Sequence, residues 1–135
     1  MGVPLLIGLF LMLHGLIHLG YVLPERWIHP RTPGWPFDMC RSWLITRLGA
    51  DATTIRELGT AFTITVFAGF VICGLAWLGL DLPPEVWIPL AGASSIASAA
   101  TLAAFFHPWV LAGLAIDLGV LWLTAAGWAP RLVAG

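Results

Sequence analysis

The stretch LFLMLHGLIHLGYVLP, residues 9–24, places two histidines four positions apart in an otherwise apolar run. A helix needs roughly 20 apolar residues to cross a hydrocarbon core of about 30 Å, and residues 4–23 meet that length. The run lacks a basic segment before it and a small-x-small cleavage site before Pro24, so a spanning helix explains it better than a secretory signal. The two histidines then need an explanation, because ionisable side chains in lipid are costly.

The rest of the chain has the same apolar character. Of its 135 residues, 59% are hydrophobic and only 10% are charged, which is too apolar for a soluble domain of this size. Three further runs reach spanning length, at residues 59–80, 86–106 and 108–128. We therefore predict an all-α fold, an integral membrane four-helix bundle, in which residues 1–135 form one transmembrane domain.

Charged residues indicate how such a bundle would be oriented. Five of the six arginines lie in residues 24–58, whereas the connection DLPPE, residues 81–85, is acidic. The positive-inside rule makes residues 24–58 a cytoplasmic loop and leaves both termini outside. The expected location is a bacterial inner membrane, which the chain crosses several times. Nucleic acid is not expected as a partner, because no basic surface interleaved with aromatic residues is present.

The long loop contains a helical pattern of its own in FDMCRSWLITRLG, residues 37–49. One face collects the apolar residues Phe37, Cys40, Trp43, Leu44 and Leu48, opposite Arg41 and Arg47. This pattern predicts a short amphipathic helix in the membrane interface, between the first two spanning helices; a surface loop packed under the bundle is the alternative. The TIRE segment, residues 54–57, has capping-box spacing and is expected to start the second spanning helix.

Polar side chains form stripes on three of the predicted helices when residues are placed at about 100° per step. The candidate site residues are His14, His18 and Tyr21 on the first helix, Ser94, Ser98 and Thr101 on the third, and Asp117 on the fourth. Each set shares one helix face. The second helix has an apolar middle and adds nothing at that depth.

Depth in the membrane brings three of these residues together. His14, Ser98 and Asp117 lie eight or nine residues from the predicted cytoplasmic ends of their spans, or roughly 12–14 Å at about 1.5 Å per residue. An aspartate at the helix centre costs on the order of 3 kcal/mol on insertion scales, and it almost always turns inward toward a partner. We therefore predict a buried contact between His14 and Asp117, with the Ser98 hydroxyl beside it.

Two roles for this cluster follow from its chemistry. Interhelical hydrogen bonds could simply clamp the bundle, and the small residues of LAGASSIASAATLAA, residues 90–104, suit close helix packing. Alternatively, His14 and His18 at i and i+4, joined by Asp117, form a two-histidine, one-carboxylate set that can hold iron or zinc. This is not the metalloprotease motif, because Gly15 stands where that motif has its glutamate base.

Two further roles are less favoured. Haem ligation needs histidines on different helices at matched depth, and only His18 with His107 meets that condition. A proton or solute path would need polar groups across the whole membrane, whereas the outer half offers little beyond Thr124.

The segments LHGLIHLGYVLP, SWLITRLG and FFHPWVLAGLAIDLGVLW, residues 13–24, 42–49 and 105–122, carry a resemblance. They resemble small bacterial four-helix membrane proteins that open on an HGLIHL segment, some of them loosely grouped as DoxX-like. The resemblance implies the four-helix fold and marks the histidines and the acidic residue of the last helix. It implies no activity, and the chain lacks the DoxX core pattern that would support a redox role.

The predicted function is that of a non-enzymatic membrane component, either an accessory or assembly subunit or a binder of a small ligand. Its partners would be the lipid bilayer and either other membrane subunits or further copies of the chain. The alternative is a metal-dependent or redox membrane enzyme that uses His14, His18 and Asp117, with a transition metal as cofactor. A proton or small-solute pathway formed on oligomerisation is the second alternative.

Overall fold

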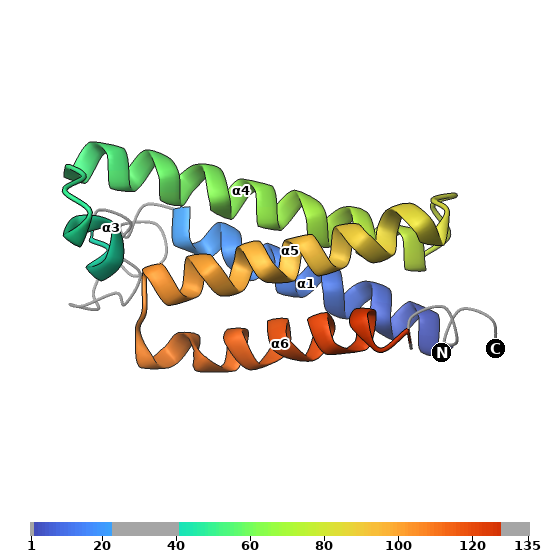
Figure 1. The fold of residues 1–135 in the computed structure, drawn as a ribbon. Helices are drawn as coiled ribbons and strands as arrows, with labels where there is room; N and C mark the ends of the chain where they lie inside the picture. Colours follow the sequence, from blue (N-terminus) through green and yellow to red (C-terminus); the bar gives the residue numbers. More distant parts are fainter. Residues whose placement is uncertain (1, 23–40, 128–135) are drawn as a thin grey trace, which may run out of the picture.

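The computed structural model describes residues 2–22 and 41–127, and this part of the chain is entirely α-helical (Figure 1). The elements are α1 (Val3–Val22), α3 (Trp43–Arg47), α4 (Ala52–Trp77), α5 (Pro84–Ala104), a 3₁₀ turn (Pro108–Val110) and α6 (Leu111–Ala125). Apolar runs of this length become helices in lipid because a helix satisfies its backbone hydrogen bonds internally. The predicted all-α fold with four long helices and a short helix between the first two is confirmed.

Each of the four long helices in the described ranges can cross a membrane. They have 20, 26, 21 and 18 residues in chain order, with the last counted from Pro108, and all are strongly apolar. Many outward-facing side chains are large and apolar, among them Leu13, Ile17 and Ile96. Lipid would cover these side chains, so the chain is a small multi-pass membrane protein.

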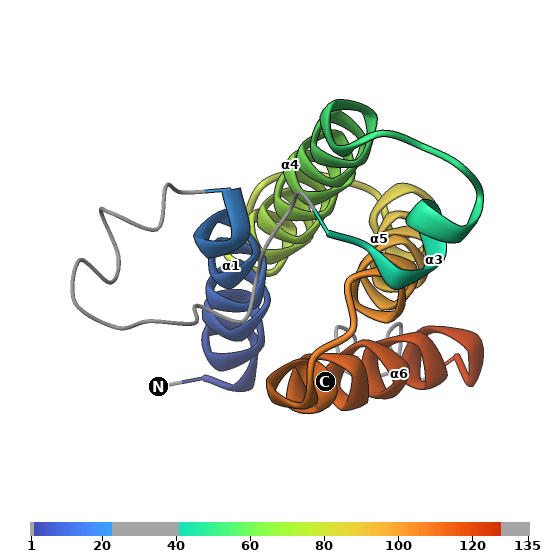
Figure 2. The same ribbon diagram turned by 90° about the vertical axis from the view of Figure 1, so that its left-hand side faces the viewer.

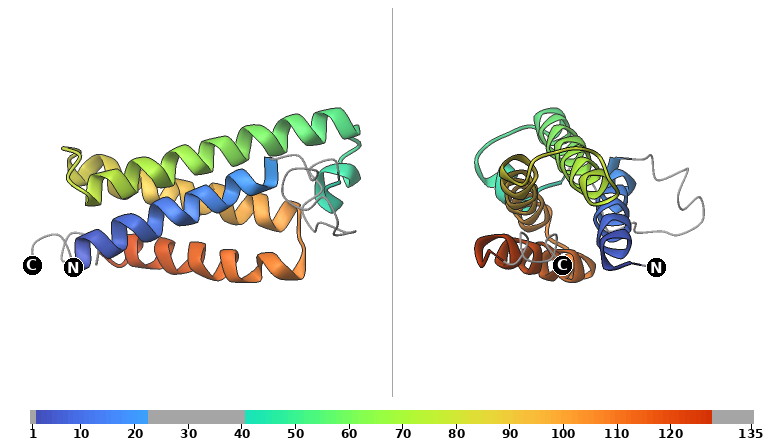
Figure 3. Two further views of the ribbon diagram at one scale, coloured as in Figure 1. Left: turned by 180° about the vertical axis from the view of Figure 1, so that it is seen from behind. Right: turned by 90° about the vertical axis from the view of Figure 1, so that its right-hand side faces the viewer.

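The long helices alternate in direction along the bundle. The beginning of α1 and the end of α6 lie at one end, and α3 lies at the opposite end beside the start of α4 (Figures 1 and 3). Seen end on, α4 lies between α1 and α5, and α6 lies below α5 (Figure 2). The helices α1 and α4, α4 and α5, and α5 and α6 pack closely, whereas α1 and α6 make few close backbone approaches.

The helix α4 begins earlier than the apolar pattern suggests. Its N-cap is Asp51, whose carboxylate accepts a hydrogen bond of 2.7 Å from the backbone N–H of Thr54. The prediction that a capping box at residues 54–57 starts the helix is therefore wrong. The helix extends over residues 52–58, which belong to the predicted loop, because charged residues end the apolar run without ending the helix.

The predicted amphipathic helix is represented by α3. Its Ser42 cap accepts a 3.1 Å hydrogen bond from the Ile45 N–H and donates a 2.7 Å hydrogen bond to the carbonyl of Ala104. Trp43 donates its indole N–H to the carbonyl of Ala103. These bonds satisfy two of the carbonyls that the end of α5 leaves without helical partners. Residues 37–40 of the predicted helix lie outside the described residues.

Glycines allow the helices to approach closely where α1 crosses α4. A Cβ atom on Gly74 would lie 2.7 Å from the carbonyl oxygen of Gly8, so the two backbones are in direct contact. Two turns farther along α1, a Cβ atom on Gly15 would lie 3.0 Å from the Cβ of Phe70. Contacts of this kind hold membrane helices together by packing alone.

Candidate functional site

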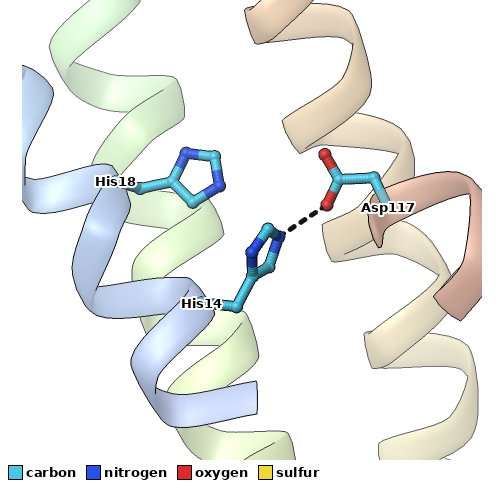
Figure 4. A group of neighbouring side chains, drawn as sticks. All are labelled: His14, His18 and Asp117. Atoms are coloured by element: carbon cyan, nitrogen blue, oxygen red, sulfur yellow. Dashed lines mark hydrogen bonds and ion pairs between the residues drawn. The ribbon is translucent and has the colours of Figure 1, made fainter. Parts of the chain in front are cut away.

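Four polar side chains meet in the interior of the bundle. His14 and His18 come from α1, Ser98 from α5 and Asp117 from α6, and at most 4% of any of them is exposed. Figure 4 shows both imidazoles leaving α1 toward the carboxylate on α6. We call these four residues the polar cluster.

Hydrogen bonds connect the four side chains in one chain of contacts. Nε2 of His14 lies 2.8 Å from Oδ1 of Asp117. The Ser98 hydroxyl donates to Oδ2 of Asp117 over 2.5 Å, and its oxygen lies 3.0 Å from Nε2 of His18. The predicted contact between His14 and Asp117, with Ser98 beside it, is confirmed.

The direction of these bonds fixes where the protons lie. The single hydroxyl proton of Ser98 goes to Asp117, so the Ser98 oxygen accepts from Nε2–H of His18. Asp117 in turn accepts from Nε2–H of His14 on its other oxygen. A buried carboxylate that receives a donor on each oxygen avoids much of the cost of losing its hydration.

One nitrogen of the cluster has no hydrogen-bond partner. Within the described part of the chain, Nδ1 of His18 is buried and unpaired, and so are the hydroxyls of Thr63 and Ser95. With the proton on Nε2, Nδ1 is a bare acceptor. Most buried polar atoms in proteins are paired, so Nδ1 of His18 is an exception that leaves one hydrogen-bonding position of the cluster unused.

Aromatic side chains hold the two imidazoles in place. The buried ring of Phe70 meets His14 edge to face at 4.8 Å between centroids and lies nearly parallel to His18 at 6.4 Å. Tyr21 contacts the other side of His18 edge to face at 5.4 Å. Phe70 reaches this position because Gly15 has no side chain. The packing role of Gly15 depends on where α4 lies, which the helical pattern of α1 does not give.

Two hollows border the contact between α1 and α6, one lined by these two segments and the other also by residues of α4 and α5. The hollow nearer α3 has a volume of about 320 Å³, and its lining includes His14, His18, Gly20, Tyr21, Trp109 and Gly113; we call it the α1–α6 groove. The other hollow, of about 150 Å³, is lined by apolar side chains and Thr124. A wider hollow of about 640 Å³ at the α3 end includes Tyr21 but none of the four cluster residues.

The other predicted site residues lie outside the cluster. Thr101 is buried, but its hydroxyl donates to the carbonyl of Ala97 on its own helix. Ser94 packs where Gly69 leaves room for it between α4 and α5. Tyr21 is half-buried and borders both the groove and His18.

The two histidines named as a possible haem pair, His18 and His107, lie in different surroundings. His107 accepts a hydrogen bond on Nδ1 from the backbone N–H of Trp109 and caps the 3₁₀ turn before α6. His18 uses Nε2 in the polar cluster. The hydrogen bonds of the two histidines are therefore made in different parts of the fold.

Fold and site together define the class: a small multi-pass membrane protein with a buried cluster of two histidines, a serine and an aspartate. Comparison of the chain with family models, curated proteins and solved structures gave no match. These comparisons identify no family for it.

Proposed function

We propose that this chain is an accessory membrane component that binds a small, lipid-soluble ligand in the α1–α6 groove, over the polar cluster. The observation that carries the proposal is that His14, His18 and Tyr21 contribute to the lining of this hollow. Ligand pockets are typically apolar hollows of about 300–1,000 Å³ with a few polar groups. The groove has this composition and a volume at the lower limit. A purely structural clamp requires the polar contacts but no hollow beside them.

The surroundings of the groove favour entry of a ligand from the bilayer. Ile17 and Trp109 belong to its lining and are 61% and 73% exposed, on a surface that lipid would cover. A ligand that enters between α1 and α6 would place its apolar part against these side chains. Its polar group would then face the imidazoles.

The proposal includes an orientation and a location. Arg41, Arg47 and Arg56 belong to the α3 end, whereas Asp81 and Glu85 belong to the opposite end. The positive-inside rule places the α3 end in the cytoplasm and both termini outside a bacterial inner membrane. On this interpretation residues 1–135 form one transmembrane domain, as in the HGLIHL-type proteins that the sequence resembles.

The exposure of α6 supports a role as one component of a larger assembly. Only 11% of the span that contains α6 is buried, against 28–39% of the other three spans. We propose that another membrane subunit, or a further copy of the chain, packs against α6. Packing of helix against helix drives such association in lipid.

A pair of glycine substitutions tests the ligand-binding function. Gly20 lines the groove, and a Cβ atom there meets nothing within 4 Å, so Gly20→Leu should fill the groove without a clash. Gly119 is equally unobstructed but lines neither hollow of the α1–α6 seam, so Gly119→Leu is the matched control. We expect the native protein and Gly119→Leu to retain the same small molecule when taken from native membranes, and Gly20→Leu to lose it.

Native mass spectrometry of each protein, followed by identification of the released compound, measures this difference. Equal retention by Gly20→Leu would contradict the proposal. So would the absence of any bound compound from the native protein.

The alternative function is a metal-dependent or redox membrane enzyme that uses His14, His18 and Asp117. It is favoured by the convergence of these three side chains. An enzyme would convert the compound held in the groove, whereas a binding protein would release it unchanged. Comparison of the bound compound before and after incubation in purified membranes therefore separates the two functions.

A proton or solute pathway has less support. The hydrogen-bonded chain of polar side chains ends at His18 on one side and at His14 on the other. Beyond His14 lies a hollow whose lining, within the described residues, is apolar except for Thr124. Thr124 donates its hydroxyl to the carbonyl of Leu121 on its own helix. A continuous pathway would therefore need polar groups from a second subunit.

A further inference from the structure

Three metal-binding side chains converge in the polar cluster. One ligand atom from each of His14, His18 and Asp117 lies within 4.8 Å of the other two, and all three residues are buried. No other group of this kind occurs in residues 2–22 and 41–127. Figure 4 shows a ring nitrogen of each histidine directed toward the region in front of the carboxylate.

We propose that His14, His18 and Asp117 bind one divalent transition-metal ion, with open coordination positions facing the α1–α6 groove. This inference uses the proposed function only in assigning the groove as the route to the open positions. The metal site itself requires only the three side chains.

The distances require only small movements of the side chains. Bonds from zinc to nitrogen or oxygen are about 2.0–2.2 Å, which places the ligand atoms of a tetrahedral site about 3.3 Å apart. The His14–Asp117 pair is already at 2.8 Å. Drawing the widest pair in from 4.8 Å takes a shift on the order of 1 Å, which rotation of the side chains can supply.

Charge favours a cation at this position. Asp117 brings a carboxylate into the middle of a membrane helix, and the arginines of the described residues belong to the α3 end of the chain. A buried carboxylate without a cation is costly even when it is hydrogen-bonded. A divalent ion would offset the charge of Asp117 and bind Nε2 of His14 and His18, whose ring protons would then lie on Nδ1.

The types of ligand atom select the class of ion. Two imidazoles and one carboxylate suit zinc or ferrous iron, whereas magnesium and calcium prefer oxygen ligands alone. Cys73, which could add a thiolate, instead contacts the carbonyl of Trp87 elsewhere in the bundle. Three protein ligands with open positions are typical of metal sites that bind a further molecule, and four ligands are typical of closed structural sites.

The surroundings of the ligands predict how firmly the ion is held. Ser98 would support the site through its hydrogen bond to Oδ2 of Asp117. The second nitrogen of a metal-bound histidine usually donates to a protein group, but Nδ1 of His18 has no partner among the described residues. We therefore expect an ion that a strong chelator removes and that rebinds when the chelator is withdrawn.

Titration of the detergent-solubilised full chain with Co²⁺ and Zn²⁺, after treatment with a chelator, tests the site. We expect one ion per chain, with visible absorption bands of Co²⁺ in a nitrogen and oxygen environment and a Zn²⁺ isotherm that saturates at the same stoichiometry. Asp117→Asn and His18→Gln should each weaken binding by about 100-fold or more, because even supporting residues contribute 10–100-fold. Ser95→Ala is the control, since it removes a buried hydroxyl of α5 that has no partner.

Native protein that fails to bind one ion per chain would overturn the proposal, and so would unchanged affinity in folded His18→Gln. If Asp117→Asn does not fold, the native stoichiometry and the His18→Gln affinity still decide the matter. Gly20→Leu should keep the ion. If native protein binds no metal but retains a small molecule that Gly20→Leu loses, only the metal site fails; if it binds metal but Gly20→Leu keeps the small molecule, only the groove proposal fails.

Discussion

The helix α1 meets its two neighbours in opposite ways. Against α4 it packs backbone to backbone, with Gly8 and Gly15 on α1 and Gly74 on α4 removing the side chains that would separate the helices. Against α6 it makes a buried hydrogen bond between His14 and Asp117, with two hollows bordering the contact. The two faces of this helix are therefore built differently: the α4 face is closely packed, and the α6 face has a buried polar contact beside open space.

Placing a side chain in the α1–α4 contact should have the largest effect on stability. In Gly74→Leu the new Cβ would lie 2.7 Å from the backbone oxygen of Gly8 and would also clash with Cγ of Met12. A backbone cannot yield as a side chain does, so we expect a loss of about 3 kcal/mol in unfolding free energy. Unfolding in mixed detergent, followed by circular dichroism, measures it.

The matched control for this change is Gly119→Leu, at an unobstructed glycine on α6. It should leave the unfolding free energy nearly unchanged. If Gly74→Leu were as stable as this control, close packing of α1 on α4 would not be the main stabilising contact of α1.

The helical pattern predicted the His14–Asp117 contact because two regularities hold in membranes. The bilayer fixes the length of a spanning helix, so counting residues from its end gives depth. The period of 3.6 residues then gives the face. Since an isolated aspartate in lipid must find a partner, depth and face together identified His14 and Ser98 beside Asp117.

Other features of the site could not be predicted from the same pattern. Thr101 shares a face with Ser98, yet its hydroxyl bonds to its own helix at Ala97, an option that serine and threonine always have. The α1–α6 groove depends on how far apart two helices settle, which no periodicity records. The start of α4 at Ala52 could not be predicted from hydropathy. Hydropathy marks the part of a helix that lies in lipid, and this helix begins before that part.

Breaking the α1–α6 contact should have an intermediate effect. Asp117→Leu leaves Nε2–H of His14 and the Ser98 hydroxyl without their acceptor, and His14→Phe removes one of the two donors to Asp117. We expect each change to lower the unfolding free energy by about 1–2 kcal/mol, because hydrogen bonds between membrane helices are worth about this much or less.

The double variant separates the pair from its surroundings. The sum of the two single losses should exceed the loss in His14→Phe, Asp117→Leu by roughly 1 kcal/mol, since the two side chains contact one another directly. The same unfolding assay applies. Strictly additive losses would show that the contact contributes nothing to stability and would remove the clamp role from the α6 face.

The smallest effect on stability is expected at Asp51, which is exposed, whereas Asp117 is buried. Asp51 is fully exposed, and the backbone hydrogen bond from Thr54 lowers its pKa from the ordinary value of 3.8. A carboxyl whose pKa is lower in the folded protein stabilises it fully above pH 3.8, and this contribution disappears as the pH falls through the lowered pKa. Asn at the cap keeps the hydrogen bond to the helix but has no titratable proton. We therefore expect Asp51→Asn to flatten the fall in stability of the native protein below pH 3.8, measured by thermal unfolding across that range. Identical pH profiles for the two proteins would show that the charge of this cap contributes nothing to stability.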